Sequence, residues 1–561
     1  MRPTVPLAAA LAALATAAAA PAAEAREVLA PGVVYERQVR PGPVIAHVVR
    51  ATRYPDRRGP EVRPRMDVRA VVGRPFATGR TPLSTIVRRH LGAGALAGLN
   101  GDYFSWSGVP SGLLLDGAGL GRDPAASRSS AVFDAGGALH VVRLGLEGAY
   151  RASTGTGRLH AINRLPREDR PEAILYDHRF GPRTPPLRAG ASVLLERTAP
   201  GPLIGTLEAR VVAVGSGGGV STAGGRLVLV EHEPGRAAAL AALRRGEVVT
   251  LDLGVPGLPE AATAGIGGGP LLVRDGVPTV APEGFTLYQT AARTARSAVG
   301  QRADGTVLMV SVEDGRSGPS RGVTTAELAR LMADLGARTA MGLDSGGSAG
   351  LSLRGAAPPT AGPEGERAIS TALILTYRGV QLNAPRPQRL SPNGDAVAER
   401  GGVRFRLTDR AAVRVELLDR RNRRVEGMGA GWRRPGVHAV RVPRGLRDGR
   451  YRVRVTARAE DERAATRMTR NLVVDRTLGH LRLGGRAGAA VVAFRLARPA
   501  RVSVIVRDAS GRARRAVAGR RLGPGGHGLR VAARPGVAEV RVLATGRLGA
   551  SELSGRVRIR R

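Results

Sequence analysis

The sequence contains no cysteine and no lysine, so all 86 of its basic residues are arginine. The lack of cysteine excludes disulfide bonds, zinc sites with thiolate ligands, a cysteine nucleophile and a lipid anchor on an N-terminal cysteine. Aromatic residues make up only 3% of the chain, so the arginines are not interleaved with the stacking side chains that nucleic-acid binders use. We therefore expect no specific nucleic-acid partner.

Long apolar runs are absent after residue 20. No later segment approaches the roughly eighteen uninterrupted apolar residues of a membrane span, and we expect no transmembrane anchor. Arg2 precedes an alanine- and leucine-rich run at residues 5–20, and small residues alternate at 20–22 and 23–25. This pattern predicts a signal peptide at residues 1–25. The mature protein is therefore expected to be secreted, extracellular or associated with the cell envelope.

The chain is long enough for about three domains, and 43% of its residues are hydrophobic, which is sufficient for real cores. Its formal charge is +40, of which residues 386–561 contribute +29 through 43 arginines and 14 acidic residues. Such a surface is attracted to polyanions, although an arginine-biased coding sequence would also give a merely solvated basic surface. We expect residues 386–561 to hold the protein near an anionic envelope polymer and to take no part in chemistry.

The central stretch, residues 293–348, has the pattern of two buried strands around one amphipathic helix. The helix is predicted from a capping box at Thr324 and Glu327 to a left-handed glycine at 336. Both strands end in a carboxylate close to glycine, at Asp314 and Asp344. Arg296 precedes the first strand, where it could reach the same cleft. Glycine-rich turns and arginine forks suit the binding of phosphate.

Two earlier motifs also follow predicted strands. Residues 100–104 follow a strand at 95–99 and begin with an asparagine, and residues 265–272 form a glycine-rich run. Taken alone, each of these motifs is typical of a simple turn. Further helices are predicted to start at Thr81 and to span residues 236–245, whereas the rest of 125–255 reads as strand and turn.

These motifs together resemble the phosphodiester glycosidase family. Residues 296–300, 314–316, 324–336 and 343–348 are similar to the second half of that domain, and 100–104 and 265–272 fit its earlier motifs. The domain occurs in the uncovering enzyme that removes N-acetylglucosamine from a phosphodiester. The resemblance covers residues 30–380. Family members usually have asparagine and glycine where this chain has Gly342 and Ser345.

The resemblance implies hydrolysis of a sugar C1–O bond whose leaving group is a phosphate ester. Its implied catalytic residues are Asp344 as nucleophile or base, Arg296 as the phosphate-binding arginine, and Asp102. Asp314 and Glu313 are alternatives to Asp102 for the second carboxylate, and retention or inversion stays open. The substrate-binding residues expected on this basis are Asn100, Gly101, Gly268, Gly269, Asp314, Arg316, Gly346, Gly347 and Ser348.

No cofactor is identified from the sequence, and the metal requirement, including a divalent cation, is left open. The expected partner is a phosphate-containing glycan or sugar-phosphodiester substrate. The alternative function is a catalytically degenerate cell-envelope glycopolymer-binding protein, which the altered residues near Asp344 favour and the retained arginine and glycines oppose.

The C-terminal part begins with a proline-containing linker predicted at residues 381–389. Beyond it lies an internal repeat with a constant offset of 89, since Phe405 matches Phe494 and His438 matches His527. Alternating apolar and polar runs predict two β-sandwiches, at 390–476 and 477–561. The first resembles the immunoglobulin-like domain of flagellar hook-cap proteins. Residues 391–395 could bind calcium, but a simple turn is favoured.

The sequence therefore predicts an α+β catalytic-type domain at residues 30–380, followed by two all-β immunoglobulin-like sandwiches.

Overall fold

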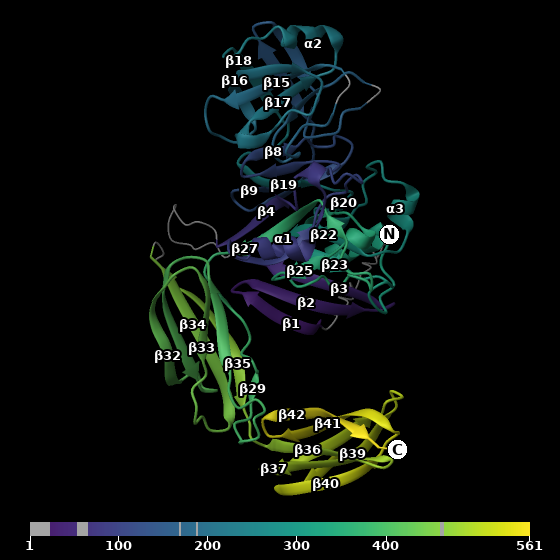
Figure 1. The fold of residues 1–561 in the computed structure, drawn as a ribbon, viewed down its shortest axis with the longest axis vertical. Helices are drawn as coiled ribbons and strands as arrows, with labels where there is room; N and C mark the ends of the chain where they lie inside the picture. Colours follow the sequence, from purple (N-terminus) through teal and green to yellow (C-terminus); the bar gives the residue numbers. More distant parts are fainter. Residues whose placement is uncertain (1–22, 53–64, 168–169, 187–188, 461–464, 561) are drawn as a thin grey trace, which may run out of the picture.

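The computed structural model describes residues 23–52, 65–167, 170–186, 189–460 and 465–560 (Figure 1). The predicted signal peptide lies almost wholly outside these residues. Within them, no helix is both long enough and apolar enough to cross a membrane. The N-terminal part occupies the upper half of Figure 1, and two β-sandwiches follow one another below it.

Two sheets packed face to face form the centre of the N-terminal part. The larger sheet has eight strands, in the order β1 (Ala23–Ala30), β2 (Val33–Arg40), β3 (Val44–Ala51), β23 (Val307–Val312), β22 (Arg296–Arg302), β24 (Ala337–Gly342), β20 (Leu271–Arg274) and β21 (Val277–Pro278). The smaller sheet has four strands, in the order β25 (Leu351–Leu353), β6 (Ala95–Asn100), β27 (Thr371–Tyr377) and β4 (Met66–Val72). Beside it, β5 (Thr81–Pro82) pairs with β26 (Ala368–Ile369).

Alternation of side chains along the strands gives each sheet two apolar faces. Val49 and Met309 of the larger sheet pack against Leu99 and Leu373 of the smaller one. The other face of the larger sheet is covered by α4 (Thr325–Asp334), and that of the smaller sheet by α1 (Leu83–Arg89). The layers are therefore helix, sheet, sheet and helix.

A second lobe, at the top of Figure 1, has its own core. A five-stranded sheet leads into it, in the order β10 (Leu139–Arg143), β9 (Ser129–Asp134), β19 (Ala262–Gly267), β7 (Leu114–Asp116) and β8 (Gly119–Arg122). The lobe itself contains an eight-stranded sheet, in the order β12 (Gly155–Leu159), β11 (Glu147–Ala152), β18 (Val248–Gly254), β16 (Gly205–Ser216), β15 (Ala191–Arg197), β17 (Leu227–Glu231), β14 (Ala173–Tyr176) and β13 (Ala161–Ile162). Its helix is α2 (Pro234–Ala241), which packs on that sheet.

The prediction of an α+β fold is wrong, because 54% of the structure is strand and only 8% is helix. The predicted helices do form, and α4 has the capping box of Thr324 and Glu327. They are short, however, since the longest α-helix in the described chain has ten residues. The residues between β7 and β19 contribute strands almost throughout. Because apolar and polar residues alternate through most of this long segment, it forms strands and not helices. The protein is therefore mostly β.

The first sandwich pairs a three-stranded sheet with a five-stranded sheet. The strands are β28 (Val380–Leu382), β30 (Gly402–Leu407) and β33 (Gly436–Arg441) against β29 (Arg389–Leu390), β35 (Thr466–Val474), β34 (Gly449–Ala459), β31 (Ala411–Leu418) and β32 (Arg424–Arg433). Because β28 pairs with β30, this sandwich begins ahead of the stretch that we predicted to be a linker.

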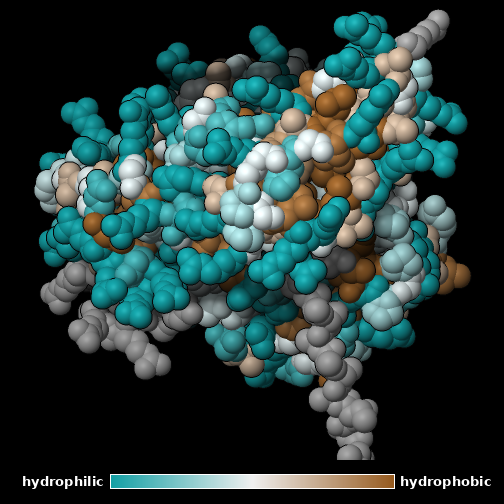
Figure 2. Space-filling view, turned by 90° about the horizontal axis from the view of Figure 1, so that it is seen from below, coloured by the Kyte–Doolittle hydropathy of each residue, from teal (hydrophilic) through white to brown (hydrophobic). Residues whose placement is uncertain are grey.

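The second sandwich repeats this plan with β36 (Leu478–Arg486), β37 (Ala489–Leu496) and β40 (Gly525–Ala532) against β39 (Ala513–Leu522), β38 (Ala500–Arg507), β41 (Gly536–Gly546) and β42 (Gly549–Ile559). In both copies the repeated histidine lies against the repeated phenylalanine, with ring centroids 5.4 Å apart for Phe405 and His438 and 5.5 Å for Phe494 and His527. Seen from the end where the second sandwich lies, hydrophilic side chains project over most of the surface (Figure 2).

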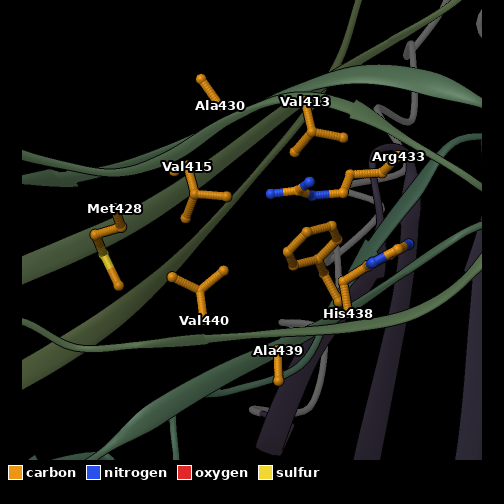
Figure 3. A pocket seen from close by; sticks show the side chains of 10 residues that line it. Val413, Val415, Met428, Ala430, Arg433, His438, Ala439 and Val440 are labelled. Carbon is orange, nitrogen blue, oxygen red and sulfur yellow. The ribbon is translucent and has the colours of Figure 1, made fainter.

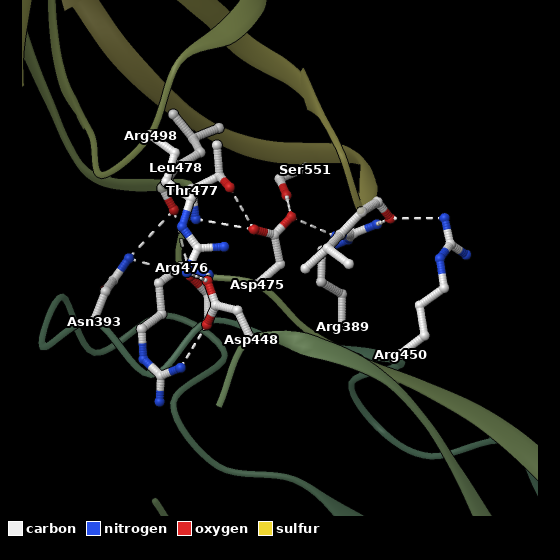
Figure 4. A network of polar contacts seen from close by, with 12 residues as sticks. Arg389, Asn393, Asp448, Arg450, Asp475, Arg476, Thr477, Leu478, Arg498 and Ser551 are labelled. Carbon is white, nitrogen blue, oxygen red and sulfur yellow. Dashed lines mark hydrogen bonds and ion pairs between the residues drawn. The ribbon is translucent and has the colours of Figure 1, made fainter. Parts of the chain in front are cut away.

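A buried carboxylate, Asp475, joins the two sandwiches (Figure 4). Only 1% of Asp475 is exposed, and it accepts hydrogen bonds from Arg389 of the first sandwich at 2.6 Å and Ser551 of the second at 2.9 Å. The loop at residues 391–395 also contacts the second sandwich, since Asn393 donates to the carbonyl of Leu478 at 3.2 Å. In the structure this loop therefore serves as part of the joint.

Replacing Asp475 with alanine should destabilise this joint, because it removes the acceptor of the half-buried Arg389 guanidinium and of the buried Ser551 hydroxyl. We expect a loss of about 3 kcal/mol in the free energy of unfolding. Urea unfolding followed by fluorescence in a Trp106→Phe background would measure it, since Trp432 then reports on the first sandwich. The exposed Glu539→Ala variant is the control, and equal stability of the two variants would contradict the prediction.

Candidate functional site

The strand ends of the two central sheets are tied together at residues 100 and 344. The side chain of Asn100 is fully buried; its amide donates to the carbonyl of Asp344 at 2.8 Å and its oxygen accepts from the Gly350 N–H at 3.0 Å. The Asp344 N–H in turn donates to the carbonyl of Gly101 at 3.1 Å. A Cβ atom on Gly101 would lie 2.4 Å from the Thr371 hydroxyl, so this close approach requires glycine. Asn100 and Gly101 therefore act as supports below the site.

A pocket of about 290 Å³ opens above these supports. It contains one carboxylate, two arginines and several aromatic side chains. Its lining residues are Arg80, Tyr103, Phe104, Ser105, Trp106, Asp344, Ser348 and Arg367. Of the sequence-predicted site residues, the structure places only Asp344 and Ser348 in the lining of this pocket.

Asp344 has an unusual electrostatic environment. Burial, together with the nearby charge of Asp102, raises the pKa of its carboxyl from 3.8 to about 6. The Ser348 hydroxyl and the Ser345 N–H, which donates to the carboxylate at 2.8 Å, partly offset this rise. Near neutral pH, both the protonated and the ionised forms of Asp344 are therefore populated.

Asp102 lies behind the pocket and is 2% exposed. Burial raises its pKa, and the guanidinium of Arg128, 3.4 Å from its Oδ1 atom, acts in the opposite direction. Its Oδ2 atom is buried and has no hydrogen-bond partner in the described part of the chain. Asp102 therefore influences Asp344 through its charge, although its own side chain does not line the pocket.

Arginine side chains gather above the loop that follows Asp344. A Cβ atom on Gly347 would lie 2.7 Å from Nε of Arg367 and 3.0 Å from Nη1 of Arg316. Arg316 is paired with Asp314 at 2.7 Å, whereas Arg367 makes no hydrogen bond or ion pair with any residue that the structure describes. Burial would raise the pKa of Asp314, but its hydrogen bonds from Arg316 and Ala295 outweigh burial and lower it.

The two glycine amides of this loop differ. The N–H of Gly346 donates to the carbonyl of Ala295 at 2.8 Å, so it is not available to a phosphate. The N–H of Gly347 donates to no group among the described residues. Gly347 alone of the two can therefore offer its amide to an anion, directly below Arg367 and Arg316.

Arg296 is 4% exposed and does not line the pocket. Its Nε donates to the carbonyl of Val323 at 2.8 Å, and its Nη2 donates to those of Gln289 at 2.7 Å and Ala292 at 2.9 Å. These bonds fix the segment around α3 (Leu287–Ala291) beside the site. Burial lowers the pKa of Arg296 and the interaction with Tyr103 opposes this, so the guanidinium contributes a buried positive charge next to Tyr103.

Gly268 and Gly269 serve the packing of the strand ends. The N–H of Gly269 donates to the carbonyl of Gly342 at 2.9 Å, and a Cβ atom on Gly268 would lie 2.7 Å from the same oxygen. They let β19 and β20 pass close to the end of β24. Among the predicted substrate-binding glycines, Gly101, Gly268, Gly269 and Gly346 therefore support the backbone around the site. Gly347 is the one whose N–H can bind an anion.

Sequence reasoning missed Arg80, Arg367 and Trp106. Trp106 is 92% exposed, and Arg80 lies 5.7 Å from the centroids of both the Phe104 and Trp106 rings. A signal was available for Trp106, since it is one of two tryptophans in the chain and follows the 100–104 motif. Arg367 lies in a loop without any motif. No group of three or more potential metal ligands occurs among the described residues.

The raised pKa of Asp344 has a consequence for stability. A carboxyl whose pKa is higher in the folded state binds protons more tightly there, so its contribution falls as pH rises from about 4 to about 6. Replacing Asp344 with asparagine should therefore stabilise the protein by about 1 to 2 kcal/mol at pH 7, after allowance for partial exposure, and by nothing at pH 4. Urea unfolding of both proteins between pH 4 and 8 would test this.

The exposed Asp275→Asn variant is the control for that comparison and should show no such pH dependence. A stability difference between wild type and Asp344→Asn that is constant over this pH range would contradict the raised pKa.

Several solved structures align with part of this chain. A protein from Synechocystis aligns over 62% of this chain and 62% of its own, with 20% identity and a TM-score of 0.49. A Burkholderia pseudomallei protein aligns over 59% of this chain and 74% of its own, with 23% identity and a TM-score of 0.46. The catalytic domain of zebrafish N-acetylglucosamine-1-phosphodiester alpha-N-acetylglucosaminidase aligns over 62% of this chain and 82% of its own, with 14% identity and a TM-score of 0.28.

No curated protein matches the sequence. The family comparison gives a match to the phosphodiester glycosidase model at residues 204–376. The matched range contains Arg296, Asp314, Asp344 and the glycine-rich runs, and it ends before the first sandwich. The chain therefore contains a phosphodiester glycosidase domain at residues 204–376.

Proposed function

We propose that this protein is an exported hydrolase that cleaves the glycosidic bond of a sugar-1-phosphodiester in an envelope or extracellular glycopolymer. One observation carries the proposal. The pocket holds the partly protonated carboxyl of Asp344 together with the unpaired guanidinium of Arg367. A carboxyl and a cation at one opening are the two groups that this reaction needs.

The chemistry follows from the leaving group. A phosphate ester departs as a stable anion, so the reaction needs less proton donation than ordinary glycoside cleavage and more stabilisation of negative charge. Arg367 is placed to bind that phosphate, with Arg316 and the Gly347 N–H beside it. This arrangement gives the phosphate-binding role to Arg367, since the Nε and Nη2 groups of Arg296 are already bonded to carbonyls.

Asp344 faces the reacting carbon in this proposal. Its ionised form would stabilise the oxocarbenium-like centre as nucleophile, or activate a water molecule as base. The fixed backbone of residue 344 holds the carboxylate against the pocket floor, which is favourable for a reaction that depends on positioning. Asp102 would tune the charge of Asp344 from behind, and Arg296 would orient Tyr103 beside it.

The aromatic side of the pocket suits a sugar ring. Phe104 and Trp106 line it, and Arg80 lies over both rings. Aromatic faces pack well against the C–H groups of a sugar, and the arginine adds positive charge close to the phosphate. The substrate proposed here therefore has its sugar against the aromatic wall and its phosphate toward Arg367.

Export and envelope association are part of the same proposal. They are supported by the signal-peptide pattern of the first 25 residues and by the arginine-rich C-terminal part. A basic surface would keep the enzyme close to anionic polymers outside the cell.

The catalytic assignment predicts that Asp344→Asn lowers kcat on an N-acetylglucosamine-1-phosphodiester by about 10³-fold, because it removes the ionisable group at the reacting centre. Arg367→Gln should lower kcat/KM by about 10²-fold through loss of charge stabilisation. Product release by the purified protein measures both effects.

Arg338→Gln is the matched control, because this arginine is exposed and paired only with Asp275 at 3.2 Å. Wild-type rates in folded Asp344→Asn protein would disprove the assignment. Tight binding of the phosphodiester without turnover by the wild type would instead support the glycopolymer-binding alternative.

A further inference from the structure

The first sandwich is open along one side. β32 and β33 are the outermost strands of their sheets, so each has one edge without a partner strand in the described structure. A groove of about 1040 Å³ lies between their ends, and a cavity of about 290 Å³ adjoins it at Met428. The walls include apolar side chains, among them Leu390, Val442 and Leu446.

Five exposed arginines surround this opening, namely Arg386, Arg400, Arg433, Arg441 and Arg444. Their side chains make no hydrogen bond or ion pair with any residue that the structure describes. The guanidinium of Arg433 is directed into the smaller cavity, below Val413 (Figure 3). Some other arginines of the same sandwich are paired, as Arg454 is with Glu416 at 2.9 Å. Five of the unpaired arginines in this sandwich therefore lie around one groove.

Two acidic side chains, Glu399 and Glu426, also line the groove. Glu399 is occupied, because it accepts hydrogen bonds from the N–H groups of Asn393 at 3.1 Å, Gly394 at 2.6 Å and Asp395 at 3.0 Å. Positive charge therefore exceeds negative charge around the groove, and it is not neutralised by the protein itself.

The second copy of the repeat shows that this cluster is not a general result of arginine-rich composition. Residues 390–476 hold 22 arginines and residues 477–561 hold 19, so the two copies are similarly basic. At the offset of 89, however, Arg400 corresponds to Ala489, Arg433 to Leu522 and Arg444 to Ala533. Only Arg441 has a basic counterpart, Arg530.

The corresponding opening of the second sandwich is also smaller. Its volume is about 360 Å³, and Asp508 lies among the three arginines that line it, which are Arg512, Arg514 and Arg534. The first sandwich therefore has the larger opening and more arginines around it, whereas the smaller opening of the second has three arginines beside Asp508.

We propose that the groove between β32 and β33 binds an extended polymer that carries phosphate groups. Guanidinium forks bind phosphate oxygens through two parallel hydrogen bonds, and the apolar walls can pack against the uncharged parts of the chain. The choice of phosphate over carboxylate rests on the function proposed above. The groove shares no lining residue with the Asp344 pocket, so binding there is independent of catalysis.

The test uses the full-length protein and long-chain inorganic polyphosphate as the probe. Replacing Arg400, Arg433, Arg441 and Arg444 with glutamine should weaken binding at least about tenfold at roughly 100 mM salt. The slope of log K against log salt between roughly 50 and 500 mM should fall by about 3, because four phosphate contacts are lost. Titration calorimetry measures both quantities without any turnover, so an inactive enzyme leaves the test unaffected.

The matched control replaces Arg514, Arg515, Arg520 and Arg521 of β39 with glutamine, which removes the same charge from the strand that corresponds to β32. This variant should bind polyphosphate within about twofold of the wild type. Equal losses in the two variants would overturn the proposal, because they would show diffuse attraction only. Binding of poly-L-glutamate without binding of polyphosphate would also overturn it, in favour of an acidic peptide.

If the fourfold variant fails to fold, Arg433→Gln and Arg441→Gln alone should each weaken binding about threefold, and unchanged affinity would overturn the proposal.

Discussion

The site depends on the hydrogen bonds that join the ends of β6 and β24. Asn100 is buried without access to water, and both ends of its amide are bonded to the backbone of the 344–350 loop. A buried amide that lost one of these partners would carry a large desolvation cost, so the two strand ends are held in one relative position. This constraint links two different sheets, and it places residue 344 at the floor of the pocket.

The fixed position of Asp344 explains its electrostatics. A carboxylate on a mobile loop would turn toward water and keep an ordinary pKa, whereas here the backbone N–H of residue 344 is bonded to Gly101 and the side chain stays at the pocket floor. The positive charges are arranged differently. Arg316 and Arg367 are exposed and lie over the glycine loop from two separate segments. A rigid acid and more adaptable cations fit the proposed reaction, in which the sugar must be positioned at the carboxylate.

The sequence predicted the parts of this structure that depend on local signals. The capping box at Thr324 and Glu327 gave the start of α4, and the constant offset of 89 indicated the repeated sandwiches. The motifs that follow the strands at residues 100 and 344 indicated two loops that meet, since Asn100 donates to the carbonyl of Asp344. It did not predict which glycine amide is free, since Gly346 donates to Ala295, a residue some fifty positions earlier. Arg367 was missed for the same reason, because its proximity to Gly347 is created only by the fold.

The α+β prediction failed because short helices with clear caps are more visible in a sequence than the many strands of residues 114–267.

The two sandwiches have diverged in a way that fits a division of roles. The joint between them is made by Asp475, which is buried and bonded to both copies, so the second sandwich braces the first. Where the first copy exposes Arg400, the second has the buried Ala489. Here three of the four groove arginines compared are replaced by residues without charge, while the Phe–His contact of the core is retained in both copies. The contact in the core is therefore common to both copies, whereas the larger groove, with five unpaired arginines around it, belongs to the first.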